Sequence, residues 1–144
     1  MADIRRTVDF EAPIDRVWAY LTDSDKIAQW MMPNNFLPID GRAFTMDCPP
    51  GIGSGAPVKC VITALEAPAD RRARLAYSWE IDKPPLTTLL TIDLVERDGV
   101  TRLDLVHSGW EPLGPDDGYV RDRHEMGWDQ LLEHRLRALL EQRS

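Results

Sequence analysis

The chain has 144 residues, with 17 Lys and Arg against 24 Asp and Glu, and a formal net charge of −7. This length fits a single domain over residues 1–144. The acidic balance argues against a nucleic-acid partner, because binding to phosphates depends on clustered basic side chains.

The sequence also bears on location and on metals. No stretch approaches the roughly 18 consecutive apolar residues of a membrane-spanning helix, and the first residues carry no apolar signal run. We therefore expect no membrane partner and a cytoplasmic location. Cys48 and Cys60, the two cysteines, are too few for a disulfide framework or a metal cluster. We expect free thiols, no metal site and no cofactor.

A strand and two helices are predicted first. Residues 4–10 alternate apolar and polar side chains, which is typical of a half-buried strand. Pro13 suits the first turn of a helix that continues through Leu21, because its missing N–H would be unpaired there anyway. Residues 22–24 can end this helix and cap a shorter one that ends near Trp30.

A hairpin is predicted next. Residues 36–39 and 42–47 flank Asp40-Gly41, a typical two-residue turn. The segment 48–55 follows as a loop. Its glycines do not indicate a phosphate site, because no Lys-Ser/Thr follows and the next element is a strand rather than a helix.

An antiparallel meander makes up the middle of the chain. Alternating apolar residues predict strands over 58–65, 73–81, 87–96 and 101–107. The connections are too short for crossovers, so neighbouring strands should pair antiparallel. Residues 108–118 then form a loop rich in Pro and Gly.

The last segment, residues 119–142, has helical periodicity. At about 100° per residue its apolar residues share one broad side. Gly127 lies on that side, where it permits either close packing or open volume. Arg135 also falls inside the apolar arc. It can extend past the sheet edge to solvent, or it can hold a buried anion.

The order of these elements, together with several short motifs, resembles a known family. The motifs are Pro13 with Val17-Trp18, Leu21-Thr22-Asp23 and Trp30; Gly41 with Phe44; Tyr77-Ser78-Trp79; Thr101 with Leu103; His107-Ser108-Gly109-Trp110; and Gly127-Trp128 with Leu132. In these the chain is similar to the activator-of-heat-shock-protein-90-ATPase-like family. That family lies within the START-like, birch-pollen-allergen-like superfamily (SRPBCC), which includes polyketide cyclases.

This resemblance implies an α+β helix-grip fold. A curved antiparallel sheet would wrap around a long C-terminal helix, with two short helices after the first strand and a cavity between sheet and helix. The superfamily shares no single catalytic motif, so the resemblance implies no catalytic residues. The sequence departs from the family at Arg135, where a leucine is common. A fold of this breadth does not determine a function.

Two histidines could carry chemistry. His107 shares the phase of Leu103 and Leu105, so its ring should face inward, either as a satisfied core histidine or as a general base or ligand contact. His124 lies one turn before Gly127 on the apolar side of the helix. Neither stands in a recognisable metal or nucleophile motif, so the catalytic residues stay unknown.

Aromatic and sulfur-bearing residues crowd the inward phases of the strands and the segments around them. Most can be ordinary core, but Met packs adaptably and Trp and Tyr add a polar tip to an apolar body. Such a lining suits an apolar or aromatic small molecule. The candidate ligand-binding residues are Trp30, Met31, Phe44, Met46, Tyr77, Trp79, His107, Trp110, His124 and Trp128.

The leading hypothesis is therefore the binding of a hydrophobic or aromatic small molecule between the sheet and the C-terminal helix. One alternative is a cyclase, dehydratase or hydrolase that uses His107 or His124 as acid–base, with Tyr77 as hydrogen-bond donor. A second, suggested by the family name alone, is a stress-response module that stimulates a chaperone ATPase. A homodimer is left open, because Trp110 lies in a loop that could expose it.

Overall fold

The computed structural model describes residues 2–48 and 56–141, so the predicted loop over 48–55 lies almost wholly outside the described residues. Its strands form one antiparallel sheet in the order β1-β6-β5-β4-β3-β2. In chain order the elements are β1 (Ile4–Phe10), α1 (Ile14–Thr22), α2 (Ser24–Trp30), β2 (Ala43–Met46), β3 (Val58–Ala69), β4 (Arg72–Asp82), β5 (Pro85–Arg97), β6 (Val100–Ser108), η1 (Pro115–Asp117), α3 (Gly118–Asp129), η2 (Gln130–Leu136) and α4 (Arg137–Leu140).

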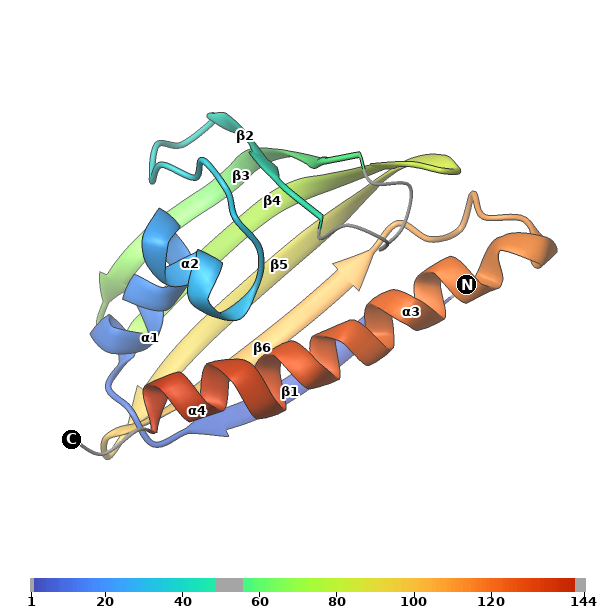
Figure 1. Cartoon of the computed structure of the whole chain (residues 1–144). Helices are drawn as coiled ribbons and strands as arrows, with labels where there is room; N and C mark the ends of the chain where they lie inside the picture. The colour runs from blue at the N-terminus through green and yellow to red at the C-terminus, as the bar shows by residue number, and fades with distance from the viewer. Residues whose placement is uncertain (1, 49–55, 142–144) are drawn as a thin grey trace.

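The helices lie on one face of the curved sheet (Figure 1). The long helix formed by α3, η2 and α4 runs beside β1 and β6, and the short α1 and α2 lie near the end of the sheet where α4 ends. This arrangement confirms the predicted α+β helix-grip architecture, with two short helices after the first strand. The core lies between the sheet and the helices.

Alternation along the strands sorts side chains between the two faces. On paired β4 and β5, Leu75 opposite Ile92 is buried on the helix side. One residue earlier on β4 the phase reverses, and Arg74 pairs with Asp93 on the exposed outer face at 2.7 Å. Period-2 patterning therefore identified the inner face of the meander correctly.

Polar contacts hold the first helix in place. The Ile14 N–H at the start of α1 donates to Glu96 Oε1 on β5 at 2.7 Å, which satisfies a helix-terminal donor. Arg16 donates to the Leu140 carbonyl at 2.6 Å, so α1 also contacts the end of the C-terminal helix. Between α1 and α2, Asp23 caps the second helix by accepting from the Lys26 N–H, which confirms the predicted break.

The predicted hairpin around Asp40-Gly41 is wrong. Residues 36–39 form no strand, and β2 pairs with β3 instead. Pro38 lacks the N–H that a strand ladder needs, and the Asn34 side chain accepts from the Phe36 N–H, bending the chain before it can extend. Gly41, at φ 80°, turns the backbone so that its N–H donates to the Ile62 carbonyl of β3.

The C-terminal helix contains a wide turn. η2 is a π-helix, inserted between the α-helical segments α3 and α4. The wider turn makes buried residues recur at every fourth position, as in Trp128, Leu132, Leu136 and Leu140. An ideal wheel of 3.6 residues per turn therefore misplaces Arg135 inside the apolar arc. Arg135 is exposed, so its predicted place inside the apolar arc is wrong and the buried-anion alternative does not hold.

One side of the C-terminal helix is held against β1. Arg6 of β1 forms an ion pair with Asp129 at 2.6 Å, and Arg137 donates to the Asp9 carbonyl at 3.1 Å. The opposite side of the helix carries Gly127 and Leu131, one turn apart. The helix is thus fixed along one edge of the sheet, with its other side turned toward β4 and β2 (Figure 1).

We expect Glu96→Ala to lower the free energy of unfolding by about 1 kcal/mol, because it leaves the Ile14 N–H without an acceptor. Urea unfolding followed by circular dichroism measures this. Glu111→Ala, at an exposed turn residue, is the matched control and should change little. Equal stability of the two variants would contradict a role for Glu96 in anchoring α1.

Candidate functional site

Five rings meet between the sheet and α3, and we call them the aromatic cluster: Trp79 of β4, His107 of β6, Trp110 of the following loop, and His124 and Trp128 of α3. Contacting ring centroids lie 4.6 to 6.1 Å apart. All of these residues were candidates from the sequence, and the structure brings them together. The cluster joins the C-terminal helix to two strands that are separated by β5.

A chain of hydrogen bonds runs through His107. Trp128 Nε1–H donates to His107 Nδ1 at 3.1 Å. Because an indole can only donate, the proton of the neutral imidazole is on Nε2, which donates to Thr88 Oγ1 at 2.7 Å. The Thr88 hydroxyl in turn donates to the Trp79 carbonyl at 2.9 Å. Every polar atom of this chain is therefore satisfied.

His124 has the opposite tautomer. Its Nδ1 lies 2.8 Å from the Val120 carbonyl, which can only accept, so Nδ1 carries the proton. Its Nε2 accepts from Trp79 Nε1–H at 3.3 Å. Both histidines are held neutral within hydrogen bonds to their neighbours.

The electrostatics agree with this geometry. Burial and, to a smaller extent, the neighbouring His124 lower the pKa of His107 from 6.5 to about 3. Burial also lowers the pKa of His124, partly offset by its bond to the Val120 carbonyl. Charging either ring would place a cation in a nearly dry site. His107 is 0% exposed, and both of its ring nitrogens have hydrogen-bond partners.

Trp110 corrects an expectation from the sequence. It is fully buried, so its loop does not expose it as a dimer patch. Gly109, at φ +99°, bends the chain so that the indole of Trp110 donates to the His107 carbonyl at 2.9 Å. A side chain at Gly109 would meet Thr88 Cα at 3.2 Å, so the close approach of the backbone to β5 requires glycine here.

A second group of rings lies further along the inner face. Phe44 of β2 contacts Phe36 and Tyr77 edge-to-face, with ring centroids 4.9 and 5.1 Å apart. Tyr77 precedes Trp79 by two residues on β4, so both side chains project from the same face of the sheet. Met46 is fully buried at the end of β2.

The hydroxyl of Tyr77 stands out. Tyr77 is only 3% exposed, yet its hydroxyl makes no hydrogen bond with any described residue. Every fully buried side-chain nitrogen or oxygen within residues 2–48 and 56–141 has a hydrogen-bond partner. The hydroxyl therefore reaches space that water can enter. Burial raises the pKa of this phenol well above 10, so it stays a neutral donor.

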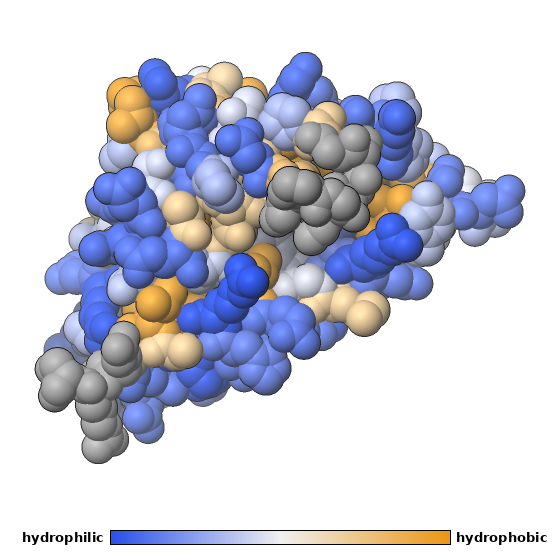
Figure 2. Space-filling model, viewed as in Figure 1, coloured by the Kyte–Doolittle hydropathy of each residue, from blue (hydrophilic) through white to orange (hydrophobic). Residues whose placement is uncertain are grey.

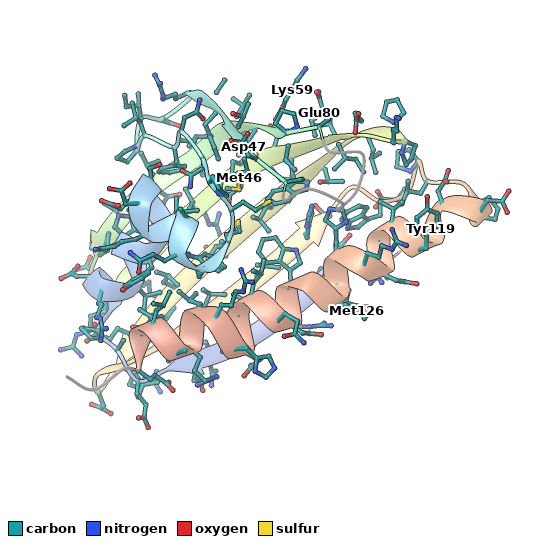
Figure 3. All side chains as sticks on the ribbon, viewed as in Figure 1. Met46, Asp47, Lys59, Glu80, Tyr119 and Met126 are labelled. Atoms are coloured by element: carbon teal, nitrogen blue, oxygen red, sulfur yellow. The ribbon has the colours of Figure 1, made fainter. Side chains whose placement is uncertain are left out.

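Gly127 on α3 is a second indication of unfilled space next to the C-terminal helix. A Cβ built there would meet nothing within 4 Å, so the open-volume alternative holds for this glycine. Figure 2 shows the surface hollowed between the C-terminal helix and the segment from α2 to β2, with strongly hydrophilic side chains along the helix. Tyr119 and Met126 point outward from α3, away from the sheet, and are 52% and 69% exposed (Figure 3).

The remaining candidates, Trp30 and Met31, pack at the end of α2. The Trp30 indole donates to the Tyr20 carbonyl at 2.8 Å, and both residues are buried in the core. Trp30 is the last residue of α2, Met31 follows it, and α2 packs beside η2.

Two surface hollows lie elsewhere. One, of about 420 Å³, is on the outer face of the sheet, where Val61, Ser78 and Thr87 contribute to its lining. Lys59 and Glu80, opposite each other on β3 and β4, also border it (Figure 3). The other, of about 330 Å³, lies beside Arg121 at the start of α3. Neither is bordered by the residues of the aromatic cluster.

Sequence reasoning missed Thr88. It shares the phase of Leu86 and Leu90 on β5, and a threonine in an apolar phase predicts a buried hydroxyl that needs partners. That signal, set beside the inward phase of His107, could have identified the pair.

Within the described ranges, no three His, Cys, Asp or Glu side chains could hold a metal ion. Both cysteines are free thiols, and burial raises the pKa of Cys60 to about 12. No helix in the part of the chain that the structure describes is long and apolar enough to cross a membrane.

The curved sheet, the long helix against it and the rings between them define a helix-grip protein. The chain belongs to the Activator of Hsp90 ATPase homolog 1-like family, whose model matches residues 11–141. No curated protein matches the chain.

Solved structures support this fold. MLL2253 from Mesorhizobium loti is 25% identical with a TM-score of 0.82, and each chain is covered over 97%. BH1534 from Bacillus halodurans is 31% identical with a TM-score of 0.77, and each chain is covered over 98%. The Aha1 dimer from Colwellia psychrerythraea is 14% identical with a TM-score of 0.64, covering 91% of this chain and 96% of that one. One protein of this fold is therefore a dimer.

We expect Thr88→Val to destabilise the protein by about 1–3 kcal/mol, although the two side chains have nearly the same shape. The change leaves His107 Nε2–H without an acceptor and the Trp79 carbonyl without its hydroxyl donor. Thr87→Val, at the adjacent exposed position, is the matched control. Urea unfolding of both variants tests the chain of hydrogen bonds, and equal midpoints would refute it.

Stability should fall in mild acid. In the unfolded chain an imidazole gains a proton below about pH 6.5, whereas His107 in the folded protein stays neutral to about pH 3. The unfolded state therefore binds more protons in this window, and the stabilisation is fully present only above it. We expect the free energy of unfolding to drop by about 2 kcal/mol from pH 7 to pH 5 through His107 alone.

Urea unfolding at the two pH values measures this drop, and His107→Gln should remove most of it. His134→Gln is the matched control, because His134 is exposed. If His107→Gln does not fold, the His107 ring resonances of the unmodified protein give a second readout. A ring that titrates near pH 6.5 in the folded state would show the prediction to be wrong.

Proposed function

We propose that this protein binds an apolar or aromatic small molecule between the inner face of the sheet and the C-terminal helix, beside Tyr77 and Gly127. The observation that carries the proposal is the Tyr77 hydroxyl, which is enclosed among apolar side chains and has no hydrogen-bond partner among the described residues. Leaving such a group unpaired is costly unless water or a ligand satisfies it.

The surroundings of Tyr77 favour an apolar ligand. Phe44 and Met46 lie on one side, and Trp79 follows along β4. Binding sites of this kind combine an apolar lining with a few polar groups that orient the ligand. Within this proposal the aromatic cluster forms one wall, and Trp30 and Met31 support α2 on the opposite side.

Gly127 provides room on the helix side. It lies on α3 next to Trp128, whose indole is fixed to His107, so the helix cannot move inward to close the space. The glycine costs helix stability of roughly 1 kcal/mol relative to alanine. An open site is a reason for that cost, because close packing does not explain it.

The geometry favours binding over acid–base catalysis at His107. Both of its ring nitrogens are engaged, and its pKa of about 3 is far from the value near 7 that suits a general base. His124 is likewise hydrogen-bonded through both nitrogens.

We expect Gly127→Leu to weaken binding of the neutral probe N-phenyl-1-naphthylamine at least about tenfold, by filling the space that the ligand would occupy. Fluorescence titration measures the affinity. The stability of the variant should hold or rise, because leucine is the better helix former. Loss of binding then cannot be attributed to unfolding.

Met126→Leu is the matched control, one residue away but exposed, and should leave the affinity unchanged.

Tyr77→Phe should lower the free energy of unfolding by less than about 0.5 kcal/mol, which is below the contribution of a normal buried hydrogen bond, because it removes no hydrogen bond within the protein. The proposal fails if the unmodified protein does not bind the probe, or if Gly127→Leu binds it as well as Met126→Leu does.

A further inference from the structure

We infer that the ligand carries an anionic group, a carboxylate or sulfonate, and that Arg135 at the rim of the site binds it. This inference rests on the proposed function and names the class of ligand more closely. The apolar body of the ligand would lie near Tyr77 and Gly127, and its charged end would remain at the surface.

Arg135 shares one side of the helix with Gly127, where a side chain would meet open space. Because buried residues recur at every fourth position in this region, Gly127, Leu131 and Arg135 form the adjoining row. Leu131 is partly buried against the core, Gly127 leaves open space, and Arg135 is exposed. Along the row toward η2, which packs beside α2, open space at Gly127 is followed by the apolar side chain of Leu131 and then by the cation of Arg135.

Arg135 also differs from the other arginines of this helix. Arg121 is paired with Glu125 at 3.2 Å, and Arg137 with Glu133 and Glu141 at 3.1 and 3.0 Å. Arg123 lies over the Tyr119 ring at 5.1 Å. Arg135 makes no ion pair or hydrogen bond with any residue in the described ranges, so its guanidinium is available.

The overall charge makes a local cation important. At a net charge of −7 the protein repels an anionic ligand at long range. A guanidinium within the Debye length of the opening, about 8 Å at physiological salt, would offset this repulsion where the ligand enters. Its planar set of donors also matches the geometry of carboxylate and sulfonate oxygens.

Two probes test the charge while keeping the apolar body the same. N-phenyl-1-naphthylamine is neutral, and 1-anilinonaphthalene-8-sulfonate adds one sulfonate to that ring system. We expect Arg135→Gln to weaken binding of the sulfonate probe about fivefold, as for an ion pair at a partly exposed site. Binding of the neutral probe should change less than about twofold, and the melting temperature should not change because Arg135 is exposed.

Arg72→Gln is the matched control, since it removes the same charge from an exposed position at the β3–β4 turn. Equal effects of Arg135→Gln and Arg72→Gln on the sulfonate probe would overturn the inference, and so would binding of the neutral probe alone. Both of these outcomes leave the proposed function standing. If neither probe binds the unmodified protein, the proposed function and this inference fail together.

Discussion

The hydrogen bond from the Trp128 indole to His107 joins two elements that share no backbone hydrogen bonds, and the placement of the C-terminal helix depends on it. The bond continues through Thr88 to the Trp79 carbonyl, so a single chain of donors and acceptors spans α3, β6, β5 and β4. Apolar packing alone tolerates small shifts of a helix along a sheet. A buried hydrogen-bonded chain tolerates few, because any shift leaves a donor or acceptor unpaired where water cannot replace it.

The series of hydrogen bonds from Trp128 to the Trp79 carbonyl also separates two regions on the inner face of the sheet. In the aromatic cluster each indole and imidazole nitrogen has a partner, and both histidines are held neutral. Only two residues away on β4, the Tyr77 hydroxyl has none among the described residues. A hydrogen-bonded cluster therefore lies beside a hydroxyl that is left to water, and under the proposed function the cluster would be a wall that keeps its shape whether or not a ligand is bound.

Much of the architecture followed from periodicity in the sequence. The meander strands and the break between α1 and α2 were predicted within a few residues, because alternation and capping are local signals. The hairpin at Asp40-Gly41 failed, since Pro38 and the Asn34 side chain compete with strand pairing and only β3 decides where β2 pairs. Inward phases selected the rings of the aromatic cluster, but their hydrogen-bond pairing depends on contacts such as Trp128 with His107, twenty-one residues apart in the chain. Trp110 shows the same limit, because one positive φ at Gly109 turns a loop residue into core.

The π-helical turn decides whether Arg135 is buried or exposed. On an ideal wheel it would be a cation in the core, which requires a buried counter-ion or a long reach to solvent. The wide turn of η2 instead aligns Leu132, Leu136 and Leu140 toward the sheet and moves Arg135 to the adjoining row with Gly127. The same distortion thus spares the protein the cost of burying a charge and brings that charge to the side of the helix where space is open. A π-helical turn has less favourable backbone geometry than an α-helix, so it is retained where the placement of side chains offsets that cost. Here the burial of Leu132, Leu136 and Leu140 in one row against the sheet provides the offset.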